Sequence, residues 1–94
     1  GELHARIAQS LANLGNWEAS AEAAATAISR GVRNPAELHL MRGMAFYELG
    51  RMTDAKEAFA AAQSAGGGSR DQATRWLAYV EREEARLREL GIRP

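Results

Sequence analysis

The sequence predicts an all-α protein, an array of antiparallel α-hairpins with two hairpin repeats and one C-terminal capping helix, five helices in all. Three observations predict this fold class. Apolar residues recur every three or four positions, and no stretch alternates with the two-residue period of a strand. Glycines interrupt the helical pattern at short intervals. The chain also matches itself when it is shifted by thirty-five residues, a period typical of stacked helical repeats.

The thirty-five-residue period includes polar and glycine positions as well as apolar ones. Leu14 and Gly15 correspond to Leu49 and Gly50. The other matching pairs are Glu2 with Glu37, Leu3 with Leu38, His4 with His39, Glu22 with Glu57, Ala27 with Ala62, and Gly31 with Gly66. A repeat of this size buries its apolar face only against its neighbours. We therefore expect a single domain over residues 1–94, divided into repeats at about 2–34 and 35–68 and a capping helix at about 69–91.

The first repeat is expected to be a helical hairpin. Its first helix is expected over residues 2–14, with one apolar face made of Leu3, Ile7, Leu11 and Leu14. Gly15 ends this helix, because a residue without Cβ readily adopts left-handed backbone. Asn16 is suited to cap the second helix, expected over about residues 17–29, and Gly31 ends that helix.

The second repeat begins at the motif Asn34-Pro35-Ala36-Glu37. The asparagine can cap the helix, proline fits the first helical turn, and the glutamate can bond back to the cap as in a capping box. This third helix is expected to continue to about residue 49 and to end at Gly50. The fourth helix is expected over about residues 52–65.

Before the last helix lies a run of three glycines, residues 66–68, which we expect to form a flexible turn. No strand precedes this run and no Lys-Ser/Thr pair follows it, so it does not match a phosphate-binding loop. Ser69 and Gln72 have the spacing of a second capping box.

The capping helix is expected over about residues 70–90, ended by Gly91 and Pro94. One stripe is suited to cover the open face of the fourth helix, and it consists of Ala73, Trp76, Leu77 and Val80. Residues 81–89 are mostly charged and are expected to form a solvated outer face. A terminal element of a repeat array needs such a polar side for solubility.

Small and large residues recur in the same order in both repeats. The second repeat carries Gly43, Ala45-Phe46-Tyr47, Leu49-Gly50, Ala55, Phe59 and Ala62. The first carries Ala8, Leu11, Leu14-Gly15, Trp17, Ala24 and Ala27. The small residues let paired helices approach closely, and the large ones fill the remaining space. This order resembles the tetratricopeptide repeat (TPR) family over about residues 2–67, and the last helix is similar to the closing helix of some bacterial TPR proteins.

The chain departs from the family pattern at four positions. His4 and His39 stand where the family favours Trp, Ser20 replaces the usual Ala, and Arg42 replaces an apolar residue. The resemblance implies a TPR-like superhelix and a protein-binding role, in which the first helix of each hairpin lines a concave groove. The lysines and asparagines with which some TPR domains clamp a chaperone's C-terminal carboxylate are not found at Ala5, Gln9 and Met41.

The register of the repeats predicts which residues line the groove. The first repeat would supply Glu2, Ala5, Gln9 and Ala12. The second would supply Glu37, Leu40, Met44 and Tyr47, and the capping helix Gln72, Arg75, Tyr79 and Arg82. Aromatic residues, Met and Arg are enriched at interfaces. We expect the partner-binding residues to be Leu40, Met44, Tyr47, Arg75, Tyr79 and Arg82. In the alternative, the capping helix buries part of this patch instead of lining the groove.

The charge balance and the amino-acid composition exclude several function classes. Lys and Arg number 12, as do Asp and Glu, so the net charge is zero. Binding to nucleic acid or to a membrane surface needs a basic face, so neither is expected. The chain has no cysteine and no apolar run of the ~20 residues that span a bilayer, and no signal peptide is visible in the residues given. We expect a soluble domain, cytoplasmic or periplasmic. The start at Gly1-Glu2 without Met suggests a fragment of a longer protein.

No constellation of residues points to catalysis. His4 and His39 are expected to be partly buried packing residues, because matching positions of stacked repeats lie about a helix diameter, roughly 10 Å, apart. A metal needs three or four converging ligands. The interleaved Glu and Arg residues after Val80 suit i,i+4 ion pairs on a solvated helix. We expect no catalytic residue, no metal and no cofactor.

The leading hypothesis is a protein–protein interaction module, an adaptor or scaffold that binds a partner peptide or helix in its concave groove. The alternative is a segment that self-associates as a homodimer or ends a longer solenoid, because the faces around Leu3, Ile7 and Leu11 lack a covering helix. RNA binding is a third hypothesis, since pentatricopeptide repeats share the thirty-five-residue period. The neutral charge and the positions of Gly43 and Ala55 favour the TPR resemblance instead.

Overall fold

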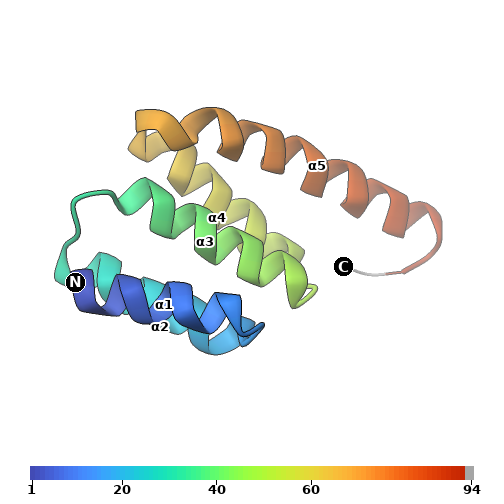
Figure 1. Ribbon diagram of the computed structural model, residues 1–94. Helices are drawn as coiled ribbons and strands as arrows, with labels where there is room; N and C mark the ends of the chain where they lie inside the picture. Colours follow the sequence, from blue (N-terminus) through green and yellow to red (C-terminus); the bar gives the residue numbers. More distant parts are fainter. Residues whose placement is uncertain (93–94) are drawn as a thin grey trace.

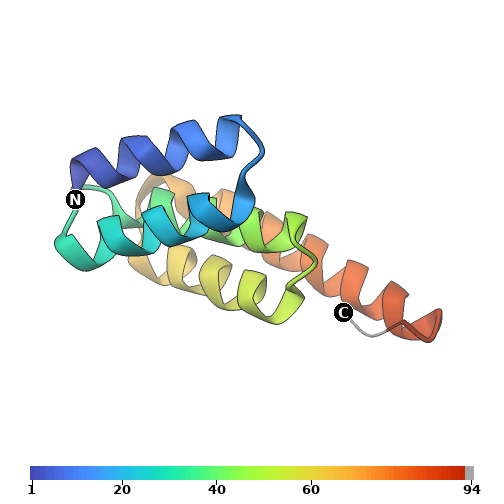
Figure 2. The same cartoon turned by 90° about the horizontal axis from the view of Figure 1, so that it is seen from below.

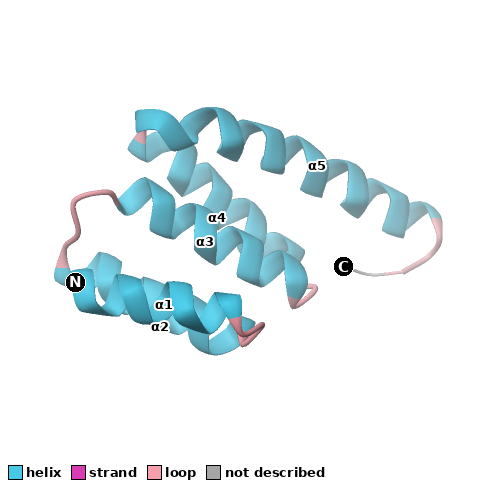
Figure 3. Cartoon of the chain, viewed as in Figure 1, coloured by secondary structure: helices cyan, strands magenta, loops and turns pink. Residues whose placement is uncertain are grey.

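The computed structural model describes residues 1–92, and the regular elements in that range are all helical (Figures 1 and 3). The elements are α1 (Glu2–Asn13), α2 (Trp17–Arg30), α3 (Pro35–Glu48), α4 (Met52–Ala65), the 3-10 helix η1 (Gly67–Ser69) and α5 (Arg70–Glu89). The expected all-α hairpin array with five α-helices is confirmed, and each helix boundary falls within one residue of its expected position. Pro94, expected to help end the last helix, lies outside the described residues.

The helices are arranged as two hairpins followed by the capping helix α5 (Figures 1 and 2). Helix α1 pairs with α2, and α3 pairs with α4. The hairpins stack through contacts between α2 and α3, and α5 packs along α4. Helices α1 and α3 are the first helices of the two hairpins, and α5 is the next helix along the array. Because α3 contacts both α1 and α5, these three helices form one side of the array.

The turns within the two hairpins have the same structure. Gly15 and Gly50 both have a φ of 76°, in the left-handed region that favours glycine. After Gly15, the N–H of Asn16 donates to the carbonyl of Leu11 at 2.9 Å. The N–H of Arg51 donates to the carbonyl of Phe46 in the same way, at 2.8 Å. Both turns are Schellman motifs, so the repeat extends to the hydrogen bonds of the backbone.

The helices start where expected, but the N-terminal caps differ from expectation, and both expected capping boxes are wrong. Neither Asn34 nor Ser69 makes a side-chain cap hydrogen bond, and Asn16 makes none either. A capping side chain reaches the first free N–H groups from extended backbone. Asn34 has a ψ of only 75°, and Ser69 already has helical φ and ψ of −83° and −6°. Ser69 is helical because η1 leads directly into α5, and the last two glycines of the run belong to this 3-10 helix.

A close approach between α3 and α4 organises the core. Gly43 lies against the ring of Phe59, and a Cβ at position 43 would fall 2.5 Å from that ring. Phe59 is completely buried, and the ring of Trp76 from α5 stacks on it with centroids 5.3 Å apart and planes at 9°. The expected role of small residues in helix approach is confirmed at Gly43, and likewise at Ala55, which is fully buried.

Ser20, one of the departures from the family pattern, has a specific partner. Its hydroxyl is buried and donates a 2.8 Å hydrogen bond to the carbonyl oxygen of Ala8 in α1. A buried hydroxyl without a partner would be destabilising, and this bond satisfies it. The serine thus ties α2 to the middle of α1.

The two histidines are half-buried packing residues, as expected. Burial lowers the pKa of His39, and the nearby Arg42 charge lowers it further. Arg42 itself lies over the ring of Phe46, with its guanidinium carbon 5.3 Å from the centroid, and Arg51 lies 4.8 Å from the same centroid. The contact of Arg42 with Phe46 is a favourable interaction for an arginine that stands where the family favours an apolar residue, although within the described residues its buried Nε has no hydrogen-bond partner. Within residues 1–92, no group of three His, Asp or Glu side chains is placed to hold a metal ion.

Candidate partner-binding groove

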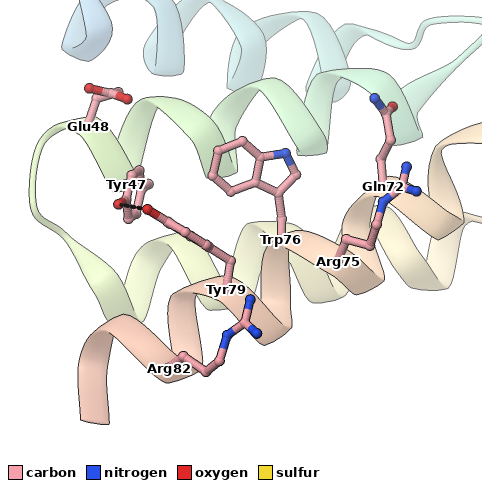
Figure 4. Close-up of a pocket in the computed structure, with 7 residues that line it drawn as sticks. All are labelled: Tyr47, Glu48, Gln72, Arg75, Trp76, Tyr79 and Arg82. Carbon is pink, nitrogen blue, oxygen red and sulfur yellow. Dashed lines mark hydrogen bonds between the residues drawn. The ribbon is translucent and has the colours of Figure 1, made fainter. Parts of the chain in front are cut away.

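The surface over α1, α3 and α5 contains three adjoining clefts. The first, which we call the aromatic pocket, has a volume of about 770 Å³ and is lined by Tyr47, Glu48, Gln72, Arg75, Trp76, Tyr79 and Arg82 (Figure 4). The second, the central cleft, has about 620 Å³ and is lined by Gln9, Ala12, Asn13, Trp17, Glu37, Leu40, Met41, Met44, Glu48, Ser69, Gln72 and Trp76. The third, the α1–α3 cleft, has about 480 Å³ and is lined by Glu2, Ala5, Arg6, Gln9, Val32, Arg33, Asn34, Glu37, Leu38 and Met41.

These clefts form one continuous groove. The aromatic pocket and the central cleft share Glu48, Gln72 and Trp76. The central cleft and the α1–α3 cleft share Gln9, Glu37 and Met41. The groove therefore crosses α1, α3 and α5 in turn.

Trp76 is the centre of the aromatic pocket. Its indole stacks on the buried Phe59 and meets Tyr47 at a centroid distance of 5.7 Å and Tyr79 at 5.8 Å. The two tyrosine rings are themselves 5.5 Å apart, edge to face. Rings in mutual contact at these distances and angles stabilise one another. The pocket wall is therefore attached to the core through Phe59.

The two tyrosines are also joined by a hydrogen bond. The Tyr47 hydroxyl donates to the Tyr79 hydroxyl oxygen at 3.1 Å, which links α3 to α5 at the wall of the pocket (Figure 4). This bond, followed by burial and by the charges of Tyr79, Glu83 and Glu48, raises the pKa of Tyr47 to about 12. Tyr47 therefore presents an uncharged hydroxyl to the groove throughout the neutral pH range.

The raised pKa of Tyr47 gives a spectroscopic prediction. We expect Tyr47 to ionise near pH 12, because only its neutral form can donate the hydrogen bond to Tyr79. The ionisation is measured by the change in ultraviolet absorbance during an alkaline titration. The chain has only two tyrosines, so Tyr79→Phe leaves Tyr47 as the sole absorbing phenol. Its midpoint should then move to lower pH. Since the folded state holds this proton more tightly, stability should fall as the pH rises above about 10 towards 12.

An unchanged midpoint in Tyr79→Phe would contradict the hydrogen bond as the main cause of the shift. Far-ultraviolet circular dichroism at each pH serves as the control, because it separates ionisation in the folded state from alkaline unfolding.

Charge is unevenly distributed along the groove. Arg75 and Arg82 are exposed and line the aromatic pocket from α5. The ion pairs found within residues 1–92 are Arg51–Asp54, Lys56–Glu84 and Arg86–Glu83, so neither arginine has a carboxylate partner there. The acidic side chains of the groove belong mainly to α3, at Glu37 and Glu48.

The structure brings together four of the six residues predicted to bind a partner. Tyr47, Arg75, Tyr79 and Arg82 all line the aromatic pocket. The other two line the adjoining central cleft, and they are Leu40 and Met44. Leu40 is only 6% exposed, so it belongs mostly to the core. Helix α5 therefore has both of the roles considered: one face fills the space over α4, and Tyr79 with the two arginines lines the groove.

Sequence reasoning missed several groove residues, and three of them are large or charged residues of the central cleft. Trp76 was assigned only to the stripe that covers α4, and Trp17 only to the core, yet both line the central cleft. Glu48 received no role. A signal was available for Trp76, because it lies three positions before Tyr79 and so shares part of its helix face.

This arrangement defines a class of protein, the helical-hairpin repeat arrays that present a concave surface across successive hairpins. The chain matches the model of the tetratricopeptide repeat over residues 6–70 and 40–87. The chain therefore belongs to the tetratricopeptide repeat family, whose repeats generally mediate protein–protein interaction. Neither a curated protein nor a solved structure gives a significant match. Of the helices described within residues 1–92, none has the length and apolar character needed to cross a membrane.

Proposed function

We propose that this chain is a protein-interaction module of the adaptor or scaffold type, not an enzyme, and that its concave groove binds a peptide or helix of a partner protein. The observation that supports this most is the aromatic pocket, in which Tyr47, Trp76 and Tyr79 line an open cleft that continues over Met44. We further propose that residues 1–94 act as one unit.

The chemistry of the groove suits this role. Tyr and Trp offer large contact areas with few rotatable bonds, so little conformational entropy is lost on binding. Met44 and Met41 are flexible and polarizable, so they can adapt to different apolar side chains. A fixed aromatic wall beside an adaptable apolar floor supports the recognition of one anchoring side chain.

The proposal is tested with peptides selected on the intact chain from a random twelve-residue display library. We expect Met44→Ala and Tyr47→Ala each to weaken the binding of the selected peptides by about tenfold, since truncating an interface anchor costs more than ~1 kcal/mol. Circular dichroism should show that both variants remain helical. Glu57→Ala, an exposed change on α4, is the matched control and should leave the affinity unchanged. Peptides whose binding depends on Glu57 and not on Met44 would overturn the proposal.

The outer face of α1 supports a second candidate function, self-association. Leu3, Ile7 and Leu14 are 61%, 42% and 81% exposed. The equivalent of Leu3 in the second repeat is Leu38, which is only 4% exposed because α2 covers that face of α3. The α1 face thus has the register of a packing surface but no covering helix within residues 1–92. We propose that a second copy of the chain covers it.

Sedimentation over a range of protein concentrations tests this second candidate. We expect a dimer that forms with increasing concentration, and we expect Leu3→Glu with Ile7→Glu to abolish it, because charges would then enter the apolar contact. The control is Glu22→Gln on α2, an exposed change that adds no apolar surface, and it should leave the dimer intact. A monomer at every concentration would refute self-association without affecting the groove.

A further inference from the structure

Helix α5 presents an arginine on either side of Tyr79, and neither forms an ion pair within residues 1–92. Arg75 and Arg82 are seven positions apart, which is two helical turns or about 10 Å along the axis. Both are exposed and line the same pocket (Figure 4). Arg86, one turn further on, is already paired with Glu83. Guanidinium groups at positions 75 and 82 are therefore free to bind a carboxylate.

The opposite charge is found along α3. The central cleft contains Glu37 and Glu48 and no basic side chain. The aromatic pocket has two arginines from α5 and one glutamate, Glu48, from α3, while the α1–α3 cleft has two arginines, Arg6 and Arg33, and two glutamates. An occupant with uniform positive charge would lie against two arginines that have no ion-pair partner within residues 1–92. An occupant with carboxylates over α5 would meet complementary charge there.

The packing of the aromatic rings excludes a different ligand. Aromatic cages that bind an ammonium group need open ring faces around a space for the cation. Here Tyr47, Trp76 and Tyr79 contact one another, with centroids 5.5 to 5.8 Å apart, and leave no such space between them. The exposed edge of this cluster is suited to an apolar side chain laid against it.

We infer that the groove binds a segment of a partner protein in which acidic side chains flank an apolar anchor, with the carboxylates over Arg75 and Arg82 and the anchor against Trp76 and Tyr79. This inference rests on the proposed groove-binding function and names the chemistry of its ligand. Arginine suits this task because its planar guanidinium can donate two parallel hydrogen bonds to one carboxylate.

The test begins with the composition of the peptides selected from the random twelve-residue library. We expect enrichment of Asp and Glu next to Leu, Phe or Trp. The affinity of these peptides should fall about tenfold or more in Arg75→Glu/Arg82→Glu, because two attractions become repulsions. The affinity should also fall as NaCl is raised from about 50 mM to about 500 mM, because exposed charge pairs are screened.

The control is Arg70→Glu/Arg88→Glu, which makes the same change in net charge on exposed positions of the same helix outside the pocket. It should leave the affinity within about twofold, since neither Arg70 nor Arg88 lines the aromatic pocket. Circular dichroism of both double variants checks that α5 remains folded.

The outcomes separate this inference from the function on which it rests. Selected peptides that lack acidic enrichment, or that bind Arg75→Glu/Arg82→Glu as tightly as the parent, would overturn the acidic-ligand inference while the groove function stands. The absence of any peptide whose binding depends on Met44 or Tyr47 would overturn both.

Discussion

Phe59→Ala is expected to destabilise the fold by about 3–5 kcal/mol, the range typical of removing a fully buried phenylalanine. Phe59 has no exposed surface and lies between Gly43 of α3 and Trp76 of α5. Its removal would leave a cavity where three helices meet, and the closing helix would lose its stacking contact. Small domains have only about 5–15 kcal/mol of total stability, so most of the margin would be lost.

Urea unfolding, followed by tryptophan fluorescence and by circular dichroism, measures this effect. The fluorescence of Trp76 should also change in the folded state, because its stacking partner is gone. Glu57→Ala on the exposed side of α4 is the control and should shift the stability by no more than about 0.5 kcal/mol. A loss below about 1 kcal/mol for Phe59→Ala would mean that the packing of α3, α4 and α5 around this ring is incorrect.

Gly43→Ala is expected to destabilise the protein by about 1–3 kcal/mol, as overpacking of a tight core does. Whether stability falls or rises in this variant distinguishes close packing from helix propensity. Glycine in a helix interior is normally about 1 kcal/mol worse than alanine, so helix propensity alone would make the variant more stable. The close approach dominates here, because a Cβ at position 43 would lie 2.5 to 2.8 Å from three ring atoms of Phe59.

Gly68→Ala provides the matched comparison. A Cβ at Gly68 would meet no atom within 4 Å, and its φ is not positive, so this variant should be neutral or slightly stabilising. A double-mutant cycle locates the cause of the Gly43 effect. Gly43→Ala should be less costly in a Phe59→Leu background, where the ring is absent. Equal costs in both backgrounds would contradict a contact between positions 43 and 59.

The helices could be predicted well from the sequence because their signals are local. Gly15 and Gly50 mark turns that need left-handed backbone, and apolar spacing marks the buried faces between them. The capping hydrogen bonds at the helix starts could not be predicted as well. The residue types at Asn34 and Ser69 permit a cap, but backbone angles set by the preceding segment decide whether the cap forms.

The groove could be predicted only in part. The repeat register identified Tyr47, Arg75, Tyr79 and Arg82, which the structure brings together in one pocket. It did not reveal that Trp76 contributes to the core and to the groove at once. That dual role depends on the rotation of α5 over α4, a tertiary feature that the sequence of an individual helix does not specify. The hydrogen bond between the two tyrosines depends on it as well.

The most direct test of the central claim is a two-dimensional ¹H–¹⁵N spectrum of the chain with and without a peptide selected on it. The chain has only two tryptophans, and both line the central cleft, so their indole N–H signals report directly on the groove. If the groove across α1, α3 and α5 binds the partner segment, both the Trp17 and the Trp76 indole signals should shift on saturation. Unmoved indole signals, together with shifts at exposed residues of α2 and α4 such as Glu22 and Glu57, would contradict the claim.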